Sequence, residues 1–184
     1  MRPPTPRSAP HASLPRSRVG AVVVALVVAA IGGGMTFALL RGDGPAAYPA
    51  PLPFAEVTAA RSPFTGFGAA RVAVGDRCLD LLVAADDEAR GTGLRQRTTT
   101  APYAGMLFAF PTDLRAGFTM ARVPVPLAIT WFGADGRPVD RTRMEPCPWA
   151  SDDECPVYES DRAFRYALEE VAPGSIASGA LGTC

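Results

Sequence analysis

The chain has 184 residues, with 18 arginines, 18 acidic residues, one histidine and no lysine. Because that histidine, His11, lies near the N-terminus, the rest of the chain cannot form a Ser-His-Asp triad or a histidine metal centre. The absence of lysine excludes a Schiff base. From Arg41 onward 14 arginines stand against 18 acids, and this net charge of −4 excludes a basic surface for nucleic acid.

An uncharged apolar run extends from Val19 to Leu40, between Arg18 and Arg41. As an α-helix it would be roughly 33 Å long, enough to cross a hydrocarbon core of about 30 Å. The run therefore predicts a transmembrane helix over residues 19–40, with membrane lipid as its partner. The arginines that precede it predict a cytoplasmic tail, residues 1–18, and an extracytoplasmic C-terminal domain at the cell membrane. A cleaved signal peptide, which would give a secreted domain, and a buried soluble helix are the alternatives.

The next segment, residues 41–65, is rich in alanine, glycine and proline. Proline has no backbone donor and favours extended backbone, so the composition predicts a semi-rigid linker. The remaining residues, 66–184, are enough for one exported domain with a core of its own.

The domain begins with two predicted strands over residues 71–74 and 79–84. A helix is predicted next, because Asp86 can cap its first turn and Asp87 and Glu88 suit its positive end. It should end near Gly91 or Gly93, since glycine favours helix ends.

Alternation of large apolar residues with other residues predicts the later strands. These strands cover residues 106–110, 118–120, 127–131 and 164–168, and a turn at 134–136 leads to a partner strand over 138–144. Many short strands and one or two short helices predict an α+β fold. We expect it to be built on a mostly antiparallel, barrel-like sheet.

Six short motifs occur in order along this domain. They are Gly-Leu-Arg-Gln-Arg at 93–97, Gly-Met-Leu-Phe-Ala-Phe at 105–110, Phe-Thr-Met at 118–120, Pro-Leu-Ala-Ile at 126–129, Asp-Gly at 135–136 and Glu-Pro-Cys at 145–147. With Arg90 upstream, residues from 71 to about 181 resemble the domain-of-unknown-function 192 family. The resemblance implies a small β-rich fold, often exported or membrane-anchored, with no established activity.

The chain departs from that family at two places. Ala121, Arg122 and Val123 stand where relatives typically have Lys-Asn-Thr, and Ala128 replaces an aspartate. If those polar groups line a pocket in relatives, most of the polar chemistry of that pocket is missing here.

Four cysteines, Cys78, Cys147, Cys155 and Cys184, follow the apolar run. An even number in an oxidising compartment predicts structural disulfides, with three possible pairings. The pair Cys147–Cys155 is favoured because the seven residues between them can close a surface loop. Neither close Cys-x-x-Cys spacing nor nearby histidine is present, so no metal or redox site is predicted.

No catalytic residue is predicted, because the spacing of the acids pairs none of them for acid–base chemistry. No cofactor is expected either, and the acidic loop at 152–154 lacks the alternation of a calcium loop. Arg90, Arg95 and Arg97 could bind a carboxylate or phosphate, although we expect Arg90 to pair with Asp86 and Arg97 to donate to backbone carbonyls.

Met120 could line an apolar cleft, and Arg122 stands where relatives carry pocket groups. The candidate ligand-binding residues are therefore Arg90, Arg97, Met120 and Arg122. The sequence favours a membrane-anchored binding or accessory module, whose partner is an envelope protein or a small molecule. A carboxylate enzyme acting on envelope carbohydrate and a structural subunit of a membrane complex are the alternatives.

Overall fold

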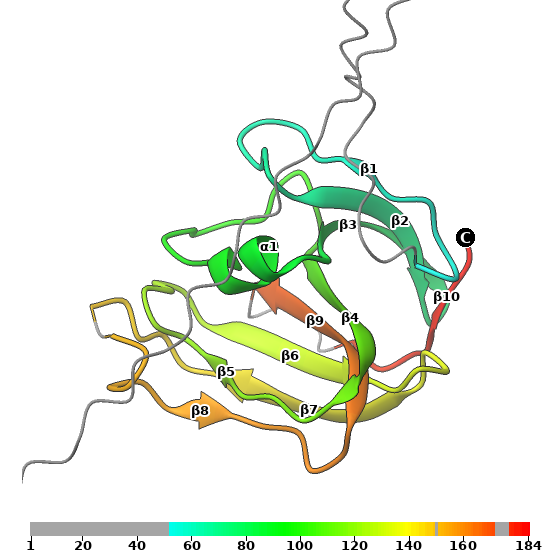
Figure 1. The fold of residues 1–184 in the computed structure, drawn as a ribbon. Coiled ribbons are helices and arrows are strands. Elements are labelled where there is room, and N and C mark those ends of the chain that lie inside the picture. The colour runs from blue at the N-terminus through cyan, green and yellow to red at the C-terminus, as the bar shows by residue number, and fades with distance from the viewer. Residues whose placement is uncertain (1–51, 150, 172–176) are drawn as a thin grey trace, which may run out of the picture. The chain divides into compact units, whose positions relative to one another are not determined.

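The computed structural model describes residues 52–149, 151–171 and 177–184. Its elements, in chain order, are β1 (Thr58–Ala59), β2 (Gly68–Val74), β3 (Arg77–Ala84), α1 (Asp87–Thr92), β4 (Met106–Leu114), β5 (Phe118–Thr119), β6 (Leu127–Phe132), β7 (Pro138–Met144), β8 (Val157–Tyr158), β9 (Phe164–Val171) and β10 (Leu181–Gly182) (Figure 1).

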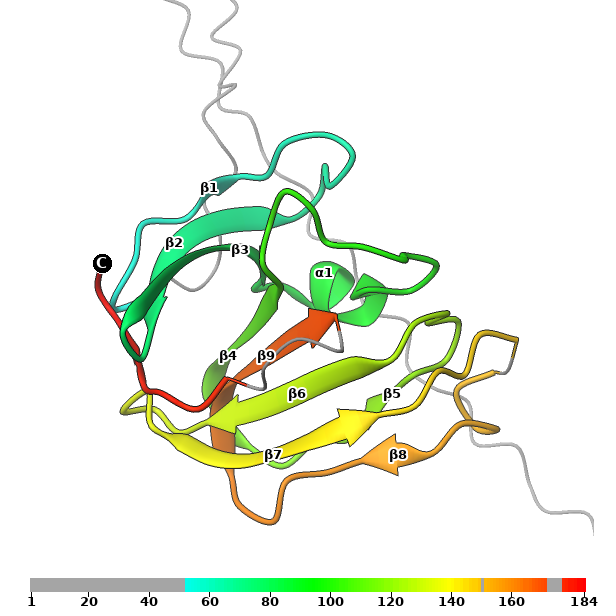
Figure 2. The same ribbon diagram turned by 180° about the vertical axis from the view of Figure 1, so that it is seen from behind.

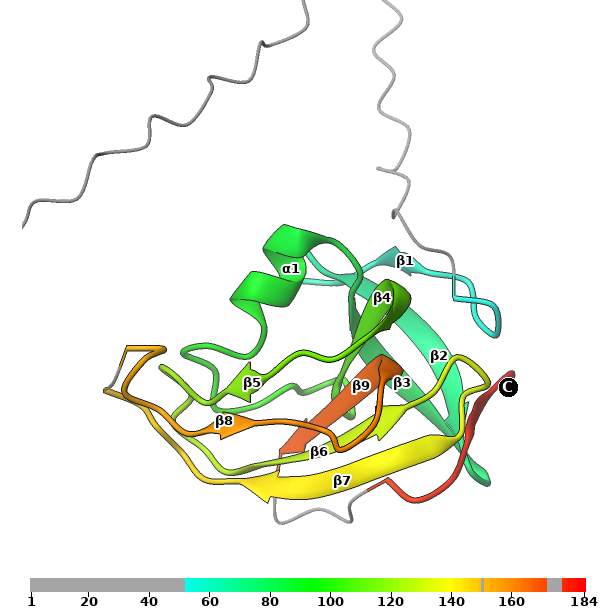
Figure 3. The same ribbon diagram turned by 60° about the horizontal axis from the view of Figure 1, so that its bottom comes forward.

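Eight of these strands form one sheet in the order β1-β2-β3-β4-β9-β6-β7, and β10 also pairs with β2. β3 and β4 are parallel and the other pairs in this sheet are antiparallel. A parallel pair needs a crossover connection, and α1 lies within the one between β3 and β4. β5 and β8 pair separately and lie side by side in Figure 3.

The predicted α+β class and barrel-like sheet are wrong. The described residues are almost entirely strand and loop, and α1, of six residues, is the one helix among them. The sheet is open, because β1 and β7 each pair with one neighbour in the described part of the chain. Alternation in the sequence identifies strands, but it does not say which strands meet or whether the last one returns to the first.

No helix in the described ranges is long and apolar enough to span a membrane. The predicted transmembrane helix over residues 19–40 and the predicted tail over 1–18 lie outside the described residues.

The two faces of the sheet carry separate cores. The first core contains the bulky side chains of Trp131, Phe164, Met106 and Ile129. The second core, on the opposite face, contains those of Phe132, Leu81, Leu107 and Leu168. Every residue of β6 is buried, because the strand is covered on both faces.

The boundary of the domain differs from the predicted linker over residues 41–65. Leu52 is buried in the second core and Phe64 in the first, and β1 pairs with β2 through Thr58 and Ala59. Residues 52–65 therefore belong to the domain. Proline and polar residues interrupt the apolar side chains of this segment, so its local composition resembles that of a linker.

The C-terminal strap, residues 177–184, contributes Ala177 and Leu181 to the second core, and its path is drawn in red in Figure 2. Ala177 is held at both backbone groups: its N–H donates to Oε2 of Glu170 at 2.9 Å, and its carbonyl accepts from Oγ1 of Thr130 at 3.1 Å. The strap then pairs with β2 through β10 and ends in the Cys78–Cys184 disulfide.

Candidate ligand-binding site

A pocket of about 280 Å³, which we name the α1 pocket, lies between α1, β4, β5 and β9. Both Figures 1 and 2 place α1 beside the C-terminal end of β9. The lining residues are 90–95, Phe108, Phe110, 116–119, Val123 and Glu169.

The predicted capping of α1 is confirmed, and it positions one wall of this pocket. Oδ1 of Asp86 accepts a hydrogen bond from the Ala89 N–H at 2.8 Å, which starts the helix. Gly93 ends it with a φ of +48°, and a Cβ there would contact the Phe108 ring at 3.5 Å. The chain can therefore turn closely over the aromatic floor of the pocket.

Aromatic rings form much of the pocket. Phe108 and Phe118 meet edge to face with ring centroids 5.3 Å apart, and Phe118 also contacts the buried Trp131 at 6.1 Å. Phe110 lies under the guanidinium of Arg90, 5.1 Å from its ring centroid. This wall is apolar and is fixed to the first core.

Arg90 lines the pocket, and its partners differ from the expected one. Its guanidinium donates to the Ala85 and Ala109 carbonyls at 2.5 and 2.8 Å and pairs with Asp87 at 2.6 Å. Asp86 is already committed as the helix cap. Arg90 thus joins α1 to β4, and its donors are largely used within the fold.

Arg95 closes the other side of the pocket. It donates to the carbonyls of Gly91 and Ala121, at 3.2 and 3.4 Å, and pairs with Asp152 at 2.6 Å. A hydrogen bond from Arg95 lowers the pKa of Asp152, and Thr119 adds a further hydrogen bond. The loop closed by the Cys147–Cys155 disulfide is therefore tied to the rim of the pocket.

Glu169 is the buried acid of the pocket. It is 5% exposed and lies between Met106 of β4 and Ile129 of β6, both fully buried in the first core. Burial raises the pKa of Glu169 to about 8, so its carboxyl is mostly protonated at neutral pH. Among the described residues no side chain or backbone group donates a hydrogen bond to it.

The other three candidate residues lie outside the pocket lining. Arg97 stacks over Phe64, 4.6 Å from its ring centroid, in place of the expected backbone carbonyls. Met120 is fully buried in the first core. Arg122 is exposed with a φ of +62°, and its backbone N–H donates to the Cys147 carbonyl.

Sequence reasoning did not single out Glu169 as a candidate site residue. The signal is the pair Glu169–Glu170 near the end of an apolar strand. Successive residues of a strand point to opposite faces, so a sheet covered on both sides must bury both acids.

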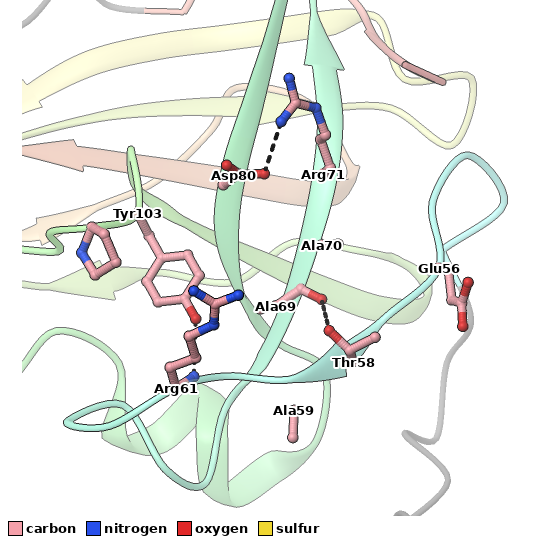
Figure 4. A pocket seen from close by; sticks show the side chains of 10 residues that line it. Glu56, Thr58, Ala59, Arg61, Ala69, Ala70, Arg71, Asp80 and Tyr103 are labelled. Atoms are coloured by element: carbon pink, nitrogen blue, oxygen red, sulfur yellow. Dashed lines mark hydrogen bonds and ion pairs between the residues drawn. The ribbon is translucent and has the colours of Figure 1, made fainter.

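A second pocket, of about 420 Å³, lies on the outer side of β2 and β3 (Figure 4). Arg71 pairs with Asp80 across it at 3.6 Å, and the hydroxyl of Tyr103 accepts from the Arg61 N–H at 2.9 Å. Its charged side chains are exposed, so this outer pocket has no buried group that requires a ligand.

All four cysteines form disulfides, Cys147–Cys155 as favoured and Cys78–Cys184. The described residues contain no group of histidine, cysteine, aspartate or glutamate side chains arranged to hold a metal ion.

The family model of DUF192, described as uncharacterised ACR proteins, matches residues 70–182. The chain belongs to the DUF192 family. This confirms the family resemblance, and the match includes both the α1 pocket and the strap up to β10. No curated protein matches the chain.

Two solved structures are similar to this DUF192 chain. One, a protein of unknown function from Novosphingobium aromaticivorans DSM 12444, has 20% identity and a TM-score of 0.54 over 72% of this chain and 89% of its own. At this identity the likeness shows the fold alone. The other is described as a candidate transcription regulator from Sinorhizobium meliloti 1021. It has 24% identity and a TM-score of 0.49 over 58% of this chain and 82% of its own.

Proposed function

We propose that this DUF192 domain is a binding module that holds a small ligand in the α1 pocket. The observation that carries the proposal is the carboxyl of Glu169, which is buried in the pocket wall without a partner among the described residues. A carboxyl that is largely withdrawn from water and has no partner raises the free energy of the fold, and a ligand that supplies the missing hydrogen bond lowers it.

The composition of the pocket supports the same proposal. Small-molecule sites are mostly apolar or aromatic concavities with a few placed polar groups. Here Phe108 and Phe118 supply the apolar surface, and Glu169 is the single acid among the described lining residues. Hydrolysis of a glycoside normally uses two carboxyl groups that flank the bond, about 5–10 Å apart. The lining therefore favours binding over the alternative of a carboxylate enzyme.

We also propose that the domain works in an extracytoplasmic compartment. Both pairs of cysteines are within bonding distance, and structural disulfides persist in oxidising compartments. Mass spectrometry of protein alkylated without reduction, after isolation from its native cells, should find no modified cysteine. Four alkylated cysteines would contradict this location.

Binding can be tested by screening the full-length protein against small fragments by ligand-observed NMR. The blocking variant is Ala116→Phe, which places a ring in the α1 pocket, and the matched control is Ala59→Phe in the outer pocket of Figure 4. We expect fragments that bind the wild type and the control and lose at least tenfold in affinity with Ala116→Phe. The proposal is wrong if no fragment binds, or if the blocking variant binds them unchanged.

A further inference from the structure

We infer that the ligand of the α1 pocket is a protonated amine on a compact apolar body, with its ammonium group bound by Glu169. This inference rests on the proposed function and adds the chemical class of the ligand. It is carried by the charges and rings that surround the pocket.

The positive groups of the pocket are already paired. Arg90 is bound to Asp87 and two backbone carbonyls, and Arg95 to Asp152 and two others. An anionic ligand would have to displace these partners, and it would also meet the Glu169 carboxyl. The pocket is therefore poorly suited to a carboxylate or phosphate.

Glu169 has no positive partner in the described structure. Burial alone shifts its pKa, and no charged group contributes to that shift. The strands on either side of it supply Met106 and Ile129, which are apolar. Two acids lie at the β5 end: Oε1 of Glu159 is 3.5 Å from where a Cβ of Gly117 would be, and Asp152 accepts a hydrogen bond from Thr119. A positively charged ligand would therefore balance the charge that Glu169 carries when it is ionised.

An ammonium group also matches the other walls. An ammonium group can donate up to three hydrogen bonds and a carboxylate only accepts them, so the pair supplies Glu169 with the hydrogen bond and the opposite charge that it lacks. The rings of Phe108 and Phe118 line the same pocket, and the face of an aromatic ring attracts cations within about 6 Å. The volume of about 280 Å³ restricts the ligand to a small body.

Binding of such a ligand releases one proton. The protonated carboxyl of Glu169 loses its proton to solvent, the ammonium group keeps its own, and the two form an ion pair. Because the pKa of Glu169 is about 8, affinity should rise about tenfold per pH unit between pH 6 and 7.5 and level off above pH 8. A neutral ligand would leave the carboxyl protonated and release nothing.

The test compares benzylamine, benzamide and benzoate, which share a ring and differ in charge. Calorimetry of the full-length protein at pH 6.5, in two buffers of different ionisation enthalpy, measures both affinity and proton release. We expect benzylamine to bind at least tenfold more tightly than benzoate at pH 8, and its binding at pH 6.5 to release about one proton.

Two variants identify the groups responsible. Glu169→Gln, which mimics the neutral acid, should weaken the binding of benzylamine at pH 8 at least tenfold and abolish proton release. The affinity for benzamide should not change. Phe118→Leu should weaken benzylamine several-fold and retain the proton release. Ala59→Phe should change neither quantity.

The inference is overturned if benzoate or benzamide binds as tightly as benzylamine at pH 8, or if benzylamine binds without releasing a proton. If this happens and Ala116→Phe still blocks the binding of other fragments, the proposed binding function stands without the ligand class inferred here. If no probe and no fragment binds, both the inference and the proposed function fail.

Discussion

Glu169 and Glu170 are neighbours on β9, and they show how differently the two faces of the sheet use a buried acid. Both are buried, and burial raises the pKa of each. Glu170 faces the second core, where it accepts the Ala177 N–H and holds the C-terminal strap. Glu169 faces the first core, where no described group binds it. One acid stabilises the fold, and the other is left available to a ligand.

Removing the disulfide that anchors the strap should have the largest effect on the free energy of unfolding. Replacing Cys78 and Cys184 by serine opens a loop with a sequence separation of 106, which the chain-entropy model values at about 4.8 kcal/mol. Urea unfolding of the full-length protein should show a loss of that order. The control is the Cys147/Cys155 double serine variant, whose short loop is worth about 2.6 kcal/mol. Equal losses would mean that the strap is held mainly by its hydrogen bonds and packing.

Stability should fall as pH rises, because of Glu169. Its pKa is raised from 4.5 in the unfolded chain to about 8 in the fold, so the folded state binds more protons between these values. The resulting stability is fully present below pH 4.5 and is lost as pH rises through 8, at up to about 1.4 kcal/mol per pH unit.

Urea unfolding at pH 5.5, 6.5, 7.5 and 8.5 measures this dependence, and Glu169→Gln should remove most of it. Glu170 contributes with the same sign, so a smaller slope should remain in that variant. The lowered pKa of Asp152 acts only at more acidic pH. Equal slopes in wild type and variant would show that Glu169 is solvated or has a partner in solution.

Leucine at each of the two positions separates their roles directly. Glu170→Leu leaves the Ala177 N–H without its acceptor and should cost about 1–3 kcal/mol in the free energy of unfolding. Glu169→Leu removes an unpaired polar group from apolar surroundings, so at pH 7.5 it should be neutral or stabilising. A large loss from Glu169→Leu would mean that its carboxyl has a structural partner.

The smallest effect is expected at the rim of the α1 pocket. Asp152 pairs with Arg95 at 2.6 Å, but the Asp152 side chain is more than half exposed. Asp152→Asn should therefore lower the free energy of unfolding by less than about 1 kcal/mol. Thermal unfolding in low and high salt is a suitable measurement, since salt should reduce the difference from wild type. If salt does not change the stability lost in Asp152→Asn, the side chain contributes through packing and not through its charge.

The sequence predicted the local elements well. Residues 106–110, 127–131 and 138–144 are strands, and Asp86 and Gly93 bound the helix. Each of these depends on side chains within a few residues, as alternation, capping and turn formation do. It also predicted the family and favoured Cys147–Cys155, because a short loop closes without knowledge of the fold.

The candidate site was predicted only in part. Of the candidate residues, Arg90 lines the α1 pocket, whereas Met120 is core and Arg122 is an exposed loop residue. The sequence could place these residues near one another by family resemblance, but it could not say which side chains face inward. The two-residue strands β1, β8 and β10 carry too few residues for a periodic signal, whereas β5 falls within the strand predicted over 118–120.

The sequence by itself determined where the longer strands, the helix cap and the hairpin form, because local contacts fix them. Only the tertiary structure decided that β9 lies between β4 and β6 and that both faces of the sheet are covered. Pairing order and burial depend on contacts between distant segments, which the local pattern around Glu169 does not contain. The fold therefore turned an acid that looks like a surface residue into the buried group of the pocket.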